Sequence, residues 1–156
     1  MISIDIPGFR TINLVHLVMD YNGTLAVDGM LLPGVAEVLK NLASQINIHV
    51  ITADTFGMVK EQLKGLPVEI TITPMEDQAG AKLRFISELG TDSVVAIGNG
   101  RNDRKMLEAA TLGIAVIQTE GSAAETLTGA DVVSPGILEA LELLLNPKRL
   151  IATLRS

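Results

Sequence analysis

The sequence predicts an α/β fold of three layers, with a mostly parallel central sheet between two layers of helices. Short runs of β-branched and aliphatic residues alternate with segments in which apolar residues recur every three or four positions. Most of the strand-like runs are apolar at consecutive positions, which is typical of strands buried on both faces of a parallel sheet. Strands and helices that alternate along the chain place helices on both sides of such a sheet.

Six runs are predicted to form the strands of this sheet, and each is bounded by Gly, Pro, Asn or Asp, which favour turns. They cover residues 14–19, 48–51, 68–73, 94–97, 114–117 and 131–134. Before them, residues 2–6 are followed by Pro7 and Gly8, which predicts an added hairpin at the edge of the sheet.

Helices are predicted between the strands and at the end of the chain. They cover residues 35–46, 58–63, 76–89, 105–110 and 138–145, and the last ends near Pro147. Between Leu25 and Pro33 the chain has room only for a short flap, in which Asp28 and Gly29 favour a hairpin turn. We therefore expect one domain of 156 residues without a cap domain.

The composition excludes several kinds of site. With 47% hydrophobic and 19% charged residues the chain is expected to be a soluble globular protein, and no apolar run is long enough for a membrane helix. It has no cysteine and two histidines, so any metal is expected on oxygen ligands. A net charge of −6 and few aromatic residues argue against nucleic-acid binding. The first residues do not form an export signal, so we expect a cytoplasmic protein.

The candidate functional residues follow the strands, because ligands of open α/β sheets bind outside the carboxyl ends of the strands. Asp20 ends the first strand of the sheet and precedes Asn22, Gly23 and Thr24, which allow a tight turn. Asp20 thus presents a carboxylate at the mouth of the sheet. An Asp before Asn-Gly is also a common turn residue, and this position alone fits either role.

Two further positions are suited to a phosphate group. Thr52 ends the second strand, and the helix that follows would favour phosphate oxygens at its N-terminus. The alternative role of Thr52 is to cap that helix. Lys82 lies beside apolar positions of the helix predicted over residues 76–89 and could reach the mouth of the sheet as a point charge. The alternative for Lys82 is a solvated lysine.

The fourth strand is followed by Gly98, Asn99, Gly100, Asn102 and Asp103. The amide and carboxylate oxygens of this loop suit Mg²⁺. Two alternatives remain from the residues alone. The Asn or Asp at its end could cap the next helix, and the Gly-x-Gly could belong to a dinucleotide-binding turn, although Asp103 occupies the place of the third glycine.

Taken together, these elements resemble the haloacid dehalogenase superfamily of phosphohydrolases, with its Rossmann-like fold. The pattern of that superfamily is Asp-x-Asp-Gly-Thr, a Thr or Ser, a Lys, and Gly-Asp-Gly-x-Asn-Asp, and its order runs here from Asp20 to Asp103. Residues 98–133 also resemble the phosphorylation domain of P-type ATPases, which points to a soluble, capless member of that branch. Receiver domains fit less well, because their acidic pair follows the first strand.

The resemblance implies a Mg²⁺-dependent phosphatase or phosphotransferase in which Asp20 forms an aspartyl-phosphate. Mg²⁺ would be held by Asp20, the main-chain carbonyl of Asn22, Asn99 and Asp103. The remaining phosphate oxygens would be bound by Thr52, Ala53 and Lys82. The expected substrate is a phosphorylated small molecule or a macromolecular phosphate. Without a cap, the flap, a neighbouring subunit of a homo-oligomer or a large substrate would exclude water.

Two residues depart from the pattern of the superfamily, and both replace Asp by Asn. Asn22 stands where the general acid and base is expected, which predicts slow dephosphorylation and a long-lived phosphoenzyme. P-type ATPases likewise lack a carboxylate there. Asn99 brings no charge to the metal site, which predicts weaker binding of Mg²⁺. The competing hypothesis is a module on the same fold that has lost catalysis and binds phosphate or a partner.

Overall fold

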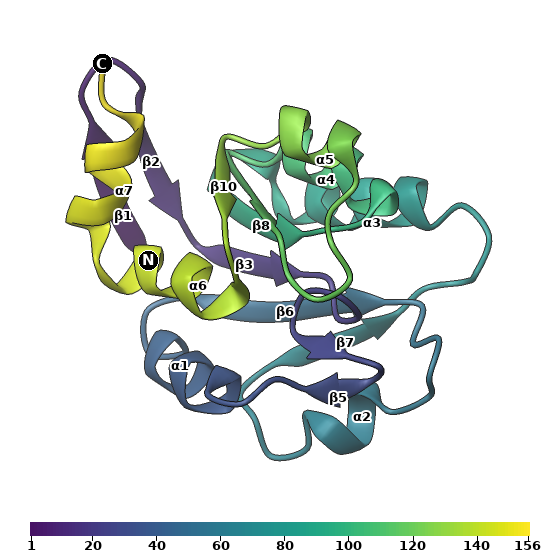
Figure 1. Cartoon of the computed structure of the whole chain (residues 1–156). Helices are drawn as coiled ribbons and strands as arrows, with labels where there is room; N and C mark the ends of the chain where they lie inside the picture. Colours follow the sequence, from purple (N-terminus) through teal and green to yellow (C-terminus); the bar gives the residue numbers. More distant parts are fainter.

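The central sheet of the computed structural model, which describes residues 1–156, has six parallel strands in the order β10-β9-β8-β3-β6-β7 (Figure 1). From the middle of the sheet, the chain runs from β3 through β6 to β7, then crosses to β8 on the other side of β3. The strand order reverses at β3, which places the crevice for a ligand beside its carboxyl end. The strands are β3 (His16–Met19), β6 (Asn47–Thr52), β7 (Glu69–Ile72), β8 (Val94–Gly98), β9 (Leu112–Val116) and β10 (Val132–Ser134).

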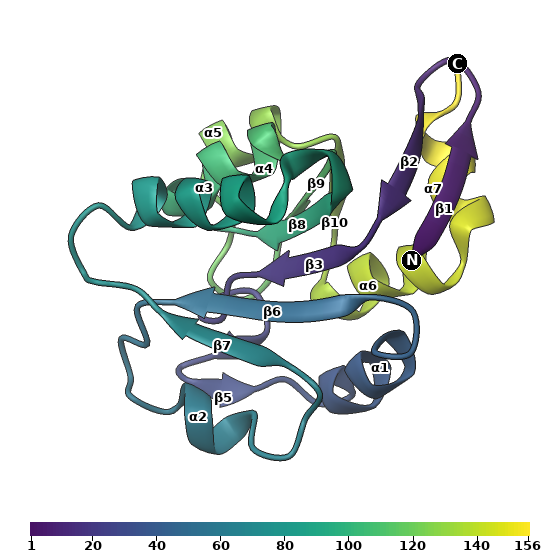
Figure 2. The same ribbon diagram turned by 180° about the vertical axis from the view of Figure 1, so that it is seen from behind.

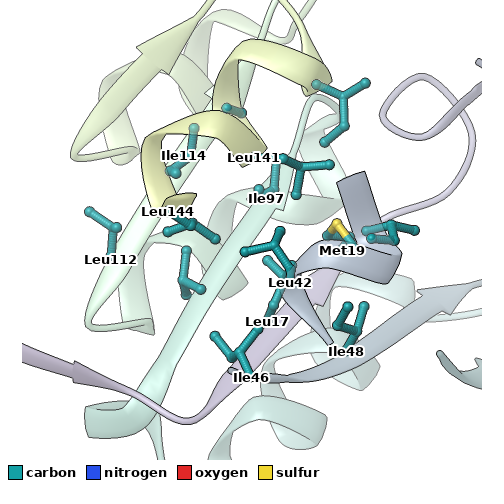
Figure 3. Close-up of a cluster of buried hydrophobic side chains, with 14 of the residues drawn as sticks. Leu17, Met19, Leu42, Ile46, Ile48, Ile97, Leu112, Ile114, Leu141 and Leu144 are labelled. Carbon is teal, nitrogen blue, oxygen red and sulfur yellow. The ribbon is translucent and has the colours of Figure 1, made fainter. Parts of the chain in front are cut away.

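Helices cover both faces of this sheet, as the alternation of elements predicted (Figures 1 and 2). One face carries α3 (Gln78–Leu89), α4 (Arg104–Ala109) and α5 (Ala124–Gly129), and the other carries α1 (Val35–Leu42) and α6 (Ile137–Leu145). In β8, Val94 and Ala96 pack with the first group, whereas Val95 and Ile97 belong to the larger cluster on the other face. Figure 3 shows part of that larger cluster, with Ile97 near Leu141 of α6.

The predicted edge hairpin exists, but it does not pair with the central sheet. β1 (Ile2–Ile6) and β2 (Arg10–Leu14) form a two-stranded antiparallel sheet of their own, which packs against the final helix, α7 (Pro147–Leu154). The strand predicted over residues 14–19 is interrupted at Val15, which separates β2 from β3. Neither α5 nor α7 is predicted from the sequence. For α7 the reason is Pro147, which indicates the end of a helix but is also favoured at the first position of a new one.

The predicted flap is a short hairpin of β4 (Ala26–Val27) and β5 (Met30–Leu31), next to α2 (Val59–Gln62). Asp28 and Gly29 at its tip have positive φ angles of 50° and 80°, as a tight hairpin requires. The buried Tyr21 donates a hydrogen bond from its hydroxyl to the carbonyl of Gly29 at 2.9 Å. The flap is therefore tied to the turn that follows β3. No helix is both long and apolar enough to cross a membrane.

Helix α1 ends four residues earlier than predicted. Residues 43–46 continue as hydrogen-bonded turns, in which the amides of Gln45 and Ile46 both donate to the carbonyl of Leu42. Ile46 is nevertheless buried in the larger apolar cluster. The spacing of apolar residues therefore predicts the burial of Ile46 correctly, although α1 ends before this residue.

Candidate functional site

A cavity of about 160 Å³ opens at the carboxyl ends of β3, β6 and β8. Five residues predicted for the site line it, namely Asp20, Asn22, Thr52, Ala53 and Asn99. Gly100 and Asn102 of the predicted loop line it as well, together with Thr55, Gln78 and Glu120. Lys82 and Asp103 do not line it, but Lys82 contacts both Asp20 and Asp103. The structure thus brings all the sequence-predicted residues into one neighbourhood.

Lys82 is buried, with 1% of its surface exposed, and its ammonium lies between two carboxylates. Its Nζ donates to Oδ1 of Asp20 at 2.7 Å and to Oδ1 of Asp103 at 2.6 Å. The alternative of a solvated lysine is therefore wrong. Burial alone would lower the pKa of Lys82, but the charges of Asp103 and Asp20 hold it above its usual value. Lys82 is thus a permanent positive charge beneath the cavity.

The Asp20 carboxyl is buried in a strongly perturbed environment. Burial, followed by the charge of Asp103, raises the pKa of Asp20 to about 7, although Lys82 opposes both effects. Because burial disfavours the ionised form of Asp20, an additional positive charge nearby would stabilise that form. The site around Asp20 therefore favours a bound cation on electrostatic grounds.

The turn after β3 holds Asp20 against the loop after β8. Gly23 has φ of 82°, and a Cβ at this position would lie 2.5 Å from both Asn99 Nδ2 and Glu120 Oε2. The buried Thr24 hydroxyl lies 3.4 Å from Asp20 Oδ2 and 3.3 Å from Asn99 Oδ1. Glycine is thus required at residue 23 both by conformation and by the close approach of two side chains.

Gln118, in the loop after β9, ties this turn to the start of α6. Its side-chain amide donates to the carbonyls of Gly23 at 3.0 Å and Thr24 at 2.7 Å. Its Oε1 accepts from the amide of Ile137 at 2.9 Å. The position of the turn after β3 therefore depends on a residue that does not line the cavity.

Asp103 shapes the loop after β8 and also holds Lys82. Its Oδ2 accepts from the amides of Asn99 at 3.0 Å and Gly100 at 2.9 Å, while its Oδ1 accepts from Lys82. A Cβ on Gly98 would lie 2.5 Å from the Asp103 carboxyl carbon, so the first glycine makes room for this carboxylate. The alternative that Asp103 caps the next helix is wrong, because its side chain makes no capping hydrogen bond to α4 and binds the loop amides and Lys82 instead.

Thr52 does not cap α2, which removes one alternative from the sequence. Its Oγ1 accepts from the amide of Asp54 at 3.0 Å, within the loop. Asp54 instead accepts from the amides of Met58 and Val59 at the start of α2. Thr52 is therefore buried at the cavity wall with its hydroxyl hydrogen available as a donor.

The oxygen donors around the cavity fit a hard divalent cation. Asn99 donates its Nδ2 to the carbonyl of Gly121 at 3.0 Å, and its Oδ1 faces Thr24 in the turn after β3. The Oδ1 of Asn22 is buried without a hydrogen-bond partner. No three His, Cys, Asp or Glu side chains gather in an arrangement that would hold a metal, so the amide oxygen of Asn99 and the main-chain carbonyl of Asn22 would complete a set begun by Asp20.

Glu120 and Gln78 were not predicted as site residues. Glu120 follows β9, whose carboxyl end lies at the same edge of the sheet, so the rule that identified Asp20 and Asn99 could have found it. Gln78 is the first residue of α3 and accepts from Asn102 Nδ2 at 2.6 Å. No sequence motif marks that contact, because it joins two segments that are distant along the chain.

Comparisons with known proteins agree with this geometry. Residues 83–130 match the model of the haloacid dehalogenase-like hydrolases. An uncharacterized protein of Methanocaldococcus jannaschii is 46% identical over 79 residues, which cover 48% of this chain and 85% of that protein.

Two solved phosphatase structures share the fold. The cobalt-bound deoxy-D-mannose-octulosonate 8-phosphate phosphatase of Haemophilus influenzae has a TM-score of 0.72 at 15% identity, over 88% of this chain and 90% of that one. The 3-deoxy-D-manno-octulosonate 8-phosphate phosphatase of Moraxella catarrhalis, in complex with magnesium ion, phosphate ion and the sugar acid, has a TM-score of 0.67 at 24% identity, over 90% and 92%. The motifs, the fold and the family model matched over residues 83–130 all agree with the haloacid dehalogenase superfamily of hydrolases, which the sequence pattern resembles.

Proposed function

We propose that this protein is a phosphohydrolase or phosphotransferase that acts on phosphate monoesters through an aspartyl-phosphate at Asp20. The observation that carries the proposal is the position of the Asp20 carboxylate at the cavity, with the buried ammonium of Lys82 2.7 Å away. A carboxylate nucleophile needs positive charge nearby when it approaches an anionic phosphate, and Lys82 supplies it.

In the first step, an oxygen of Asp20 bonds to phosphorus while the ester P–O bond breaks. Thr52 and the loop at Ala53 line the cavity and would bind phosphoryl oxygens, and Lys82 would reach a further oxygen from its buried position beside Asp20. Asp20, Asn22, Asn99 and Asp103 are the residues proposed to hold Mg²⁺, which when bound neutralises charge shared by the carboxylate and the phosphate. The departing alkoxide takes its proton from solvent, because Asn22 has no acidic proton to give.

In the second step, water attacks phosphorus, the Asp20–phosphorus link breaks and phosphate leaves. The attacking water must lose a proton, and Asn22 cannot accept it. General acid and base catalysis contributes roughly 10²- to 10⁴-fold to such steps, so this step is expected to limit turnover. Another hydroxyl compound in place of water would give a phosphotransferase.

The open cavity and the two phosphatase structures support a phosphorylated substrate whose remainder lies outside the cavity. A volume of about 160 Å³ accommodates a phosphoryl group but little more. The neighbours are phosphatases of an 8-phosphorylated sugar acid. A phosphorylated small molecule with an exposed leaving group fits this site, and a phosphate carried by a macromolecule fits it as well.

The direct test is to measure hydrolysis of an activated aryl phosphate with Mg²⁺ by the wild type and by Asp20→Asn. We expect the wild type to turn over the substrate and to be labelled by a radioactive phosphoryl donor in a form that is stable to acid. We expect Asp20→Asn to show neither turnover nor labelling. Retained turnover in Asp20→Asn would refute the role of Asp20. Phosphate-dependent stabilisation without turnover by the wild type would favour a module that only binds phosphate.

A further inference from the structure

A second depression, of about 420 Å³, adjoins the catalytic cavity. It is lined by Ala79, Arg101, Asn102, Arg104, Lys105 and Glu125. The side chain of Asn102 belongs to both, and its bond to Gln78 fixes it at the boundary. Any substrate with its phosphoryl group at Asp20 and a leaving group that passes Asn102 would enter this depression.

Positive charge is concentrated there. Three of the six lining residues are cationic, and Glu125 is the one acidic residue among them, in a chain whose net charge is −6. Arg101 Nε and Arg104 Nη1 share the same Glu125 oxygen, at 3.4 Å and 3.1 Å. One carboxylate therefore serves two guanidinium groups.

The acidic residues around the depression do not neutralise all of its positive charges. Arg104 also contacts Glu108 at 3.2 Å, while Lys105 forms no ion pair. Asp77 lies near enough to Lys105 to feel its charge, but its carboxylate is paired with Arg84 at 3.2 Å. Arg101 and Lys105 thus retain N–H groups that donate to no acceptor in the protein.

We propose that this depression is a subsite for a second anionic group of the substrate, either a carboxylate or a second phosphate on the leaving group. The proposal rests on the proposed function, because the phosphoryl group held at Asp20 sets where the second anion falls. Guanidinium and ammonium groups are the side chains suited to both anions. The subsite gives a capless enzyme a way to select its leaving group without an inserted domain.

The test compares aliphatic phosphate monoesters of matched length that end in a methyl group, a carboxylate or a second phosphate. For the wild type we expect kcat/KM to be about three- to tenfold higher for an anionic end, as exposed ion pairs allow. This preference should weaken at high salt. The carboxylate and phosphate arms show which anion the subsite takes.

The double variant Arg101→Gln/Lys105→Gln should lose the preference, expressed as the ratio of kcat/KM between anionic and methyl ends. The matched control Lys40→Gln/Lys148→Gln removes two exposed charges elsewhere and should retain it. Equal kcat/KM for all three ends in the wild type, or an unchanged ratio in the Arg101/Lys105 variant, would overturn the subsite.

Binding to Asp20→Asn separates this proposal from the proposed function. Calorimetric titration of that variant with the same three esters needs no turnover. Tighter binding of the anionic esters, lost when Arg101→Gln/Lys105→Gln is added, supports the subsite even if the wild type hydrolyses none of them. Turnover by the wild type with no difference in binding or kcat/KM supports the proposed function and refutes the subsite.

Discussion

The ammonium of Lys82 donates to the Asp20 carboxylate at 2.7 Å, and the lysine side chain is almost wholly buried. The same ammonium donates to Asp103 at 2.6 Å. One buried cation is therefore shared by two buried carboxylates, which lie in the segments that follow the neighbouring strands β3 and β8.

Lys82→Met should destabilise the protein strongly, because it leaves two carboxylates buried without a cation. Removing one partner of a buried ion pair costs about 3–5 kcal/mol. Urea unfolding of both proteins measures the loss, with Lys40→Met as a control for an exposed lysine. Equal midpoints for Lys82→Met and the wild type would contradict the buried arrangement.

The raised pKa of Asp20 gives metal-free protein a pH-dependent stability. Because the folded state binds this proton up to about pH 7 and the unfolded state only up to about 3.8, the contribution is full below 3.8 and is lost as pH rises to 7. The free energy of unfolding of the wild type, relative to Asp20→Asn, should therefore fall across this range in the presence of a chelator.

Addition of Mg²⁺ should reverse that trend, since a cation favours the ionised carboxylate. Wild-type and Asp20→Asn curves that stay parallel between pH 4 and 7 would show that the pKa of Asp20 is not raised. Thermal unfolding over a series of buffers is sufficient for the comparison.

Asn22→Asp should accelerate steady-state turnover and lower the amount of trapped phosphoenzyme. The new carboxyl would supply the missing acid and base, which is typically worth about 10²- to 10⁴-fold. Asn22→Ser, which adds no titratable group, is the matched control. Faster turnover in both variants would mean that the gain comes from altered packing instead of proton transfer.

Asn99→Asp should raise the affinity for Mg²⁺ by adding charge to an oxygen that already faces Thr24 in the turn after β3. The midpoint of the Mg²⁺-dependent thermal shift measures this affinity without turnover. Asn41→Asp, an exposed change on α1, serves as the control. An unchanged midpoint in Asn99→Asp would remove Asn99 from the proposed ligands.

Gln118→Ala should reduce kcat more than it raises KM, because the turn of Gly23 and Thr24 loses two hydrogen bonds that fix its position. Gln118→Glu keeps the acceptor for Ile137 but not the donors, so it should share the defect in kcat. A defect confined to thermal stability in both variants would make Gln118 purely structural.

The sequence predicted those parts of the site that are local to a strand end. Asp20, Thr52 and Asn99 each follow an apolar run, and parallel strands bring such positions to one edge. The burial of Lys82 could not be predicted, because the carboxylates that compensate it lie 62 and 21 residues away along the chain. The kinship to the P-type ATPase branch stays a prediction.

The elements that escaped prediction have weak local signals. Within α5, Thr126 is buried where an apolar residue would reveal the pattern, and its hydroxyl donates to the Gly100 carbonyl. In α7, Leu150 is buried, but the helix begins at Pro147, a residue that also fits the end of the preceding helix. In both α5 and α7, the formation of a helix depends on contacts with distant parts of the chain.

The hydrogen bond from Tyr21 to Gly29 has a kinetic consequence. Movement of the hairpin away from the turn after β3 would break this bond and expose the buried ring of Tyr21, which follows Asp20 directly in the chain. The hairpin is therefore expected to stay in place throughout a reaction cycle, so the rate at which product escapes should depend on the fixed width of the opening and not on any gating motion.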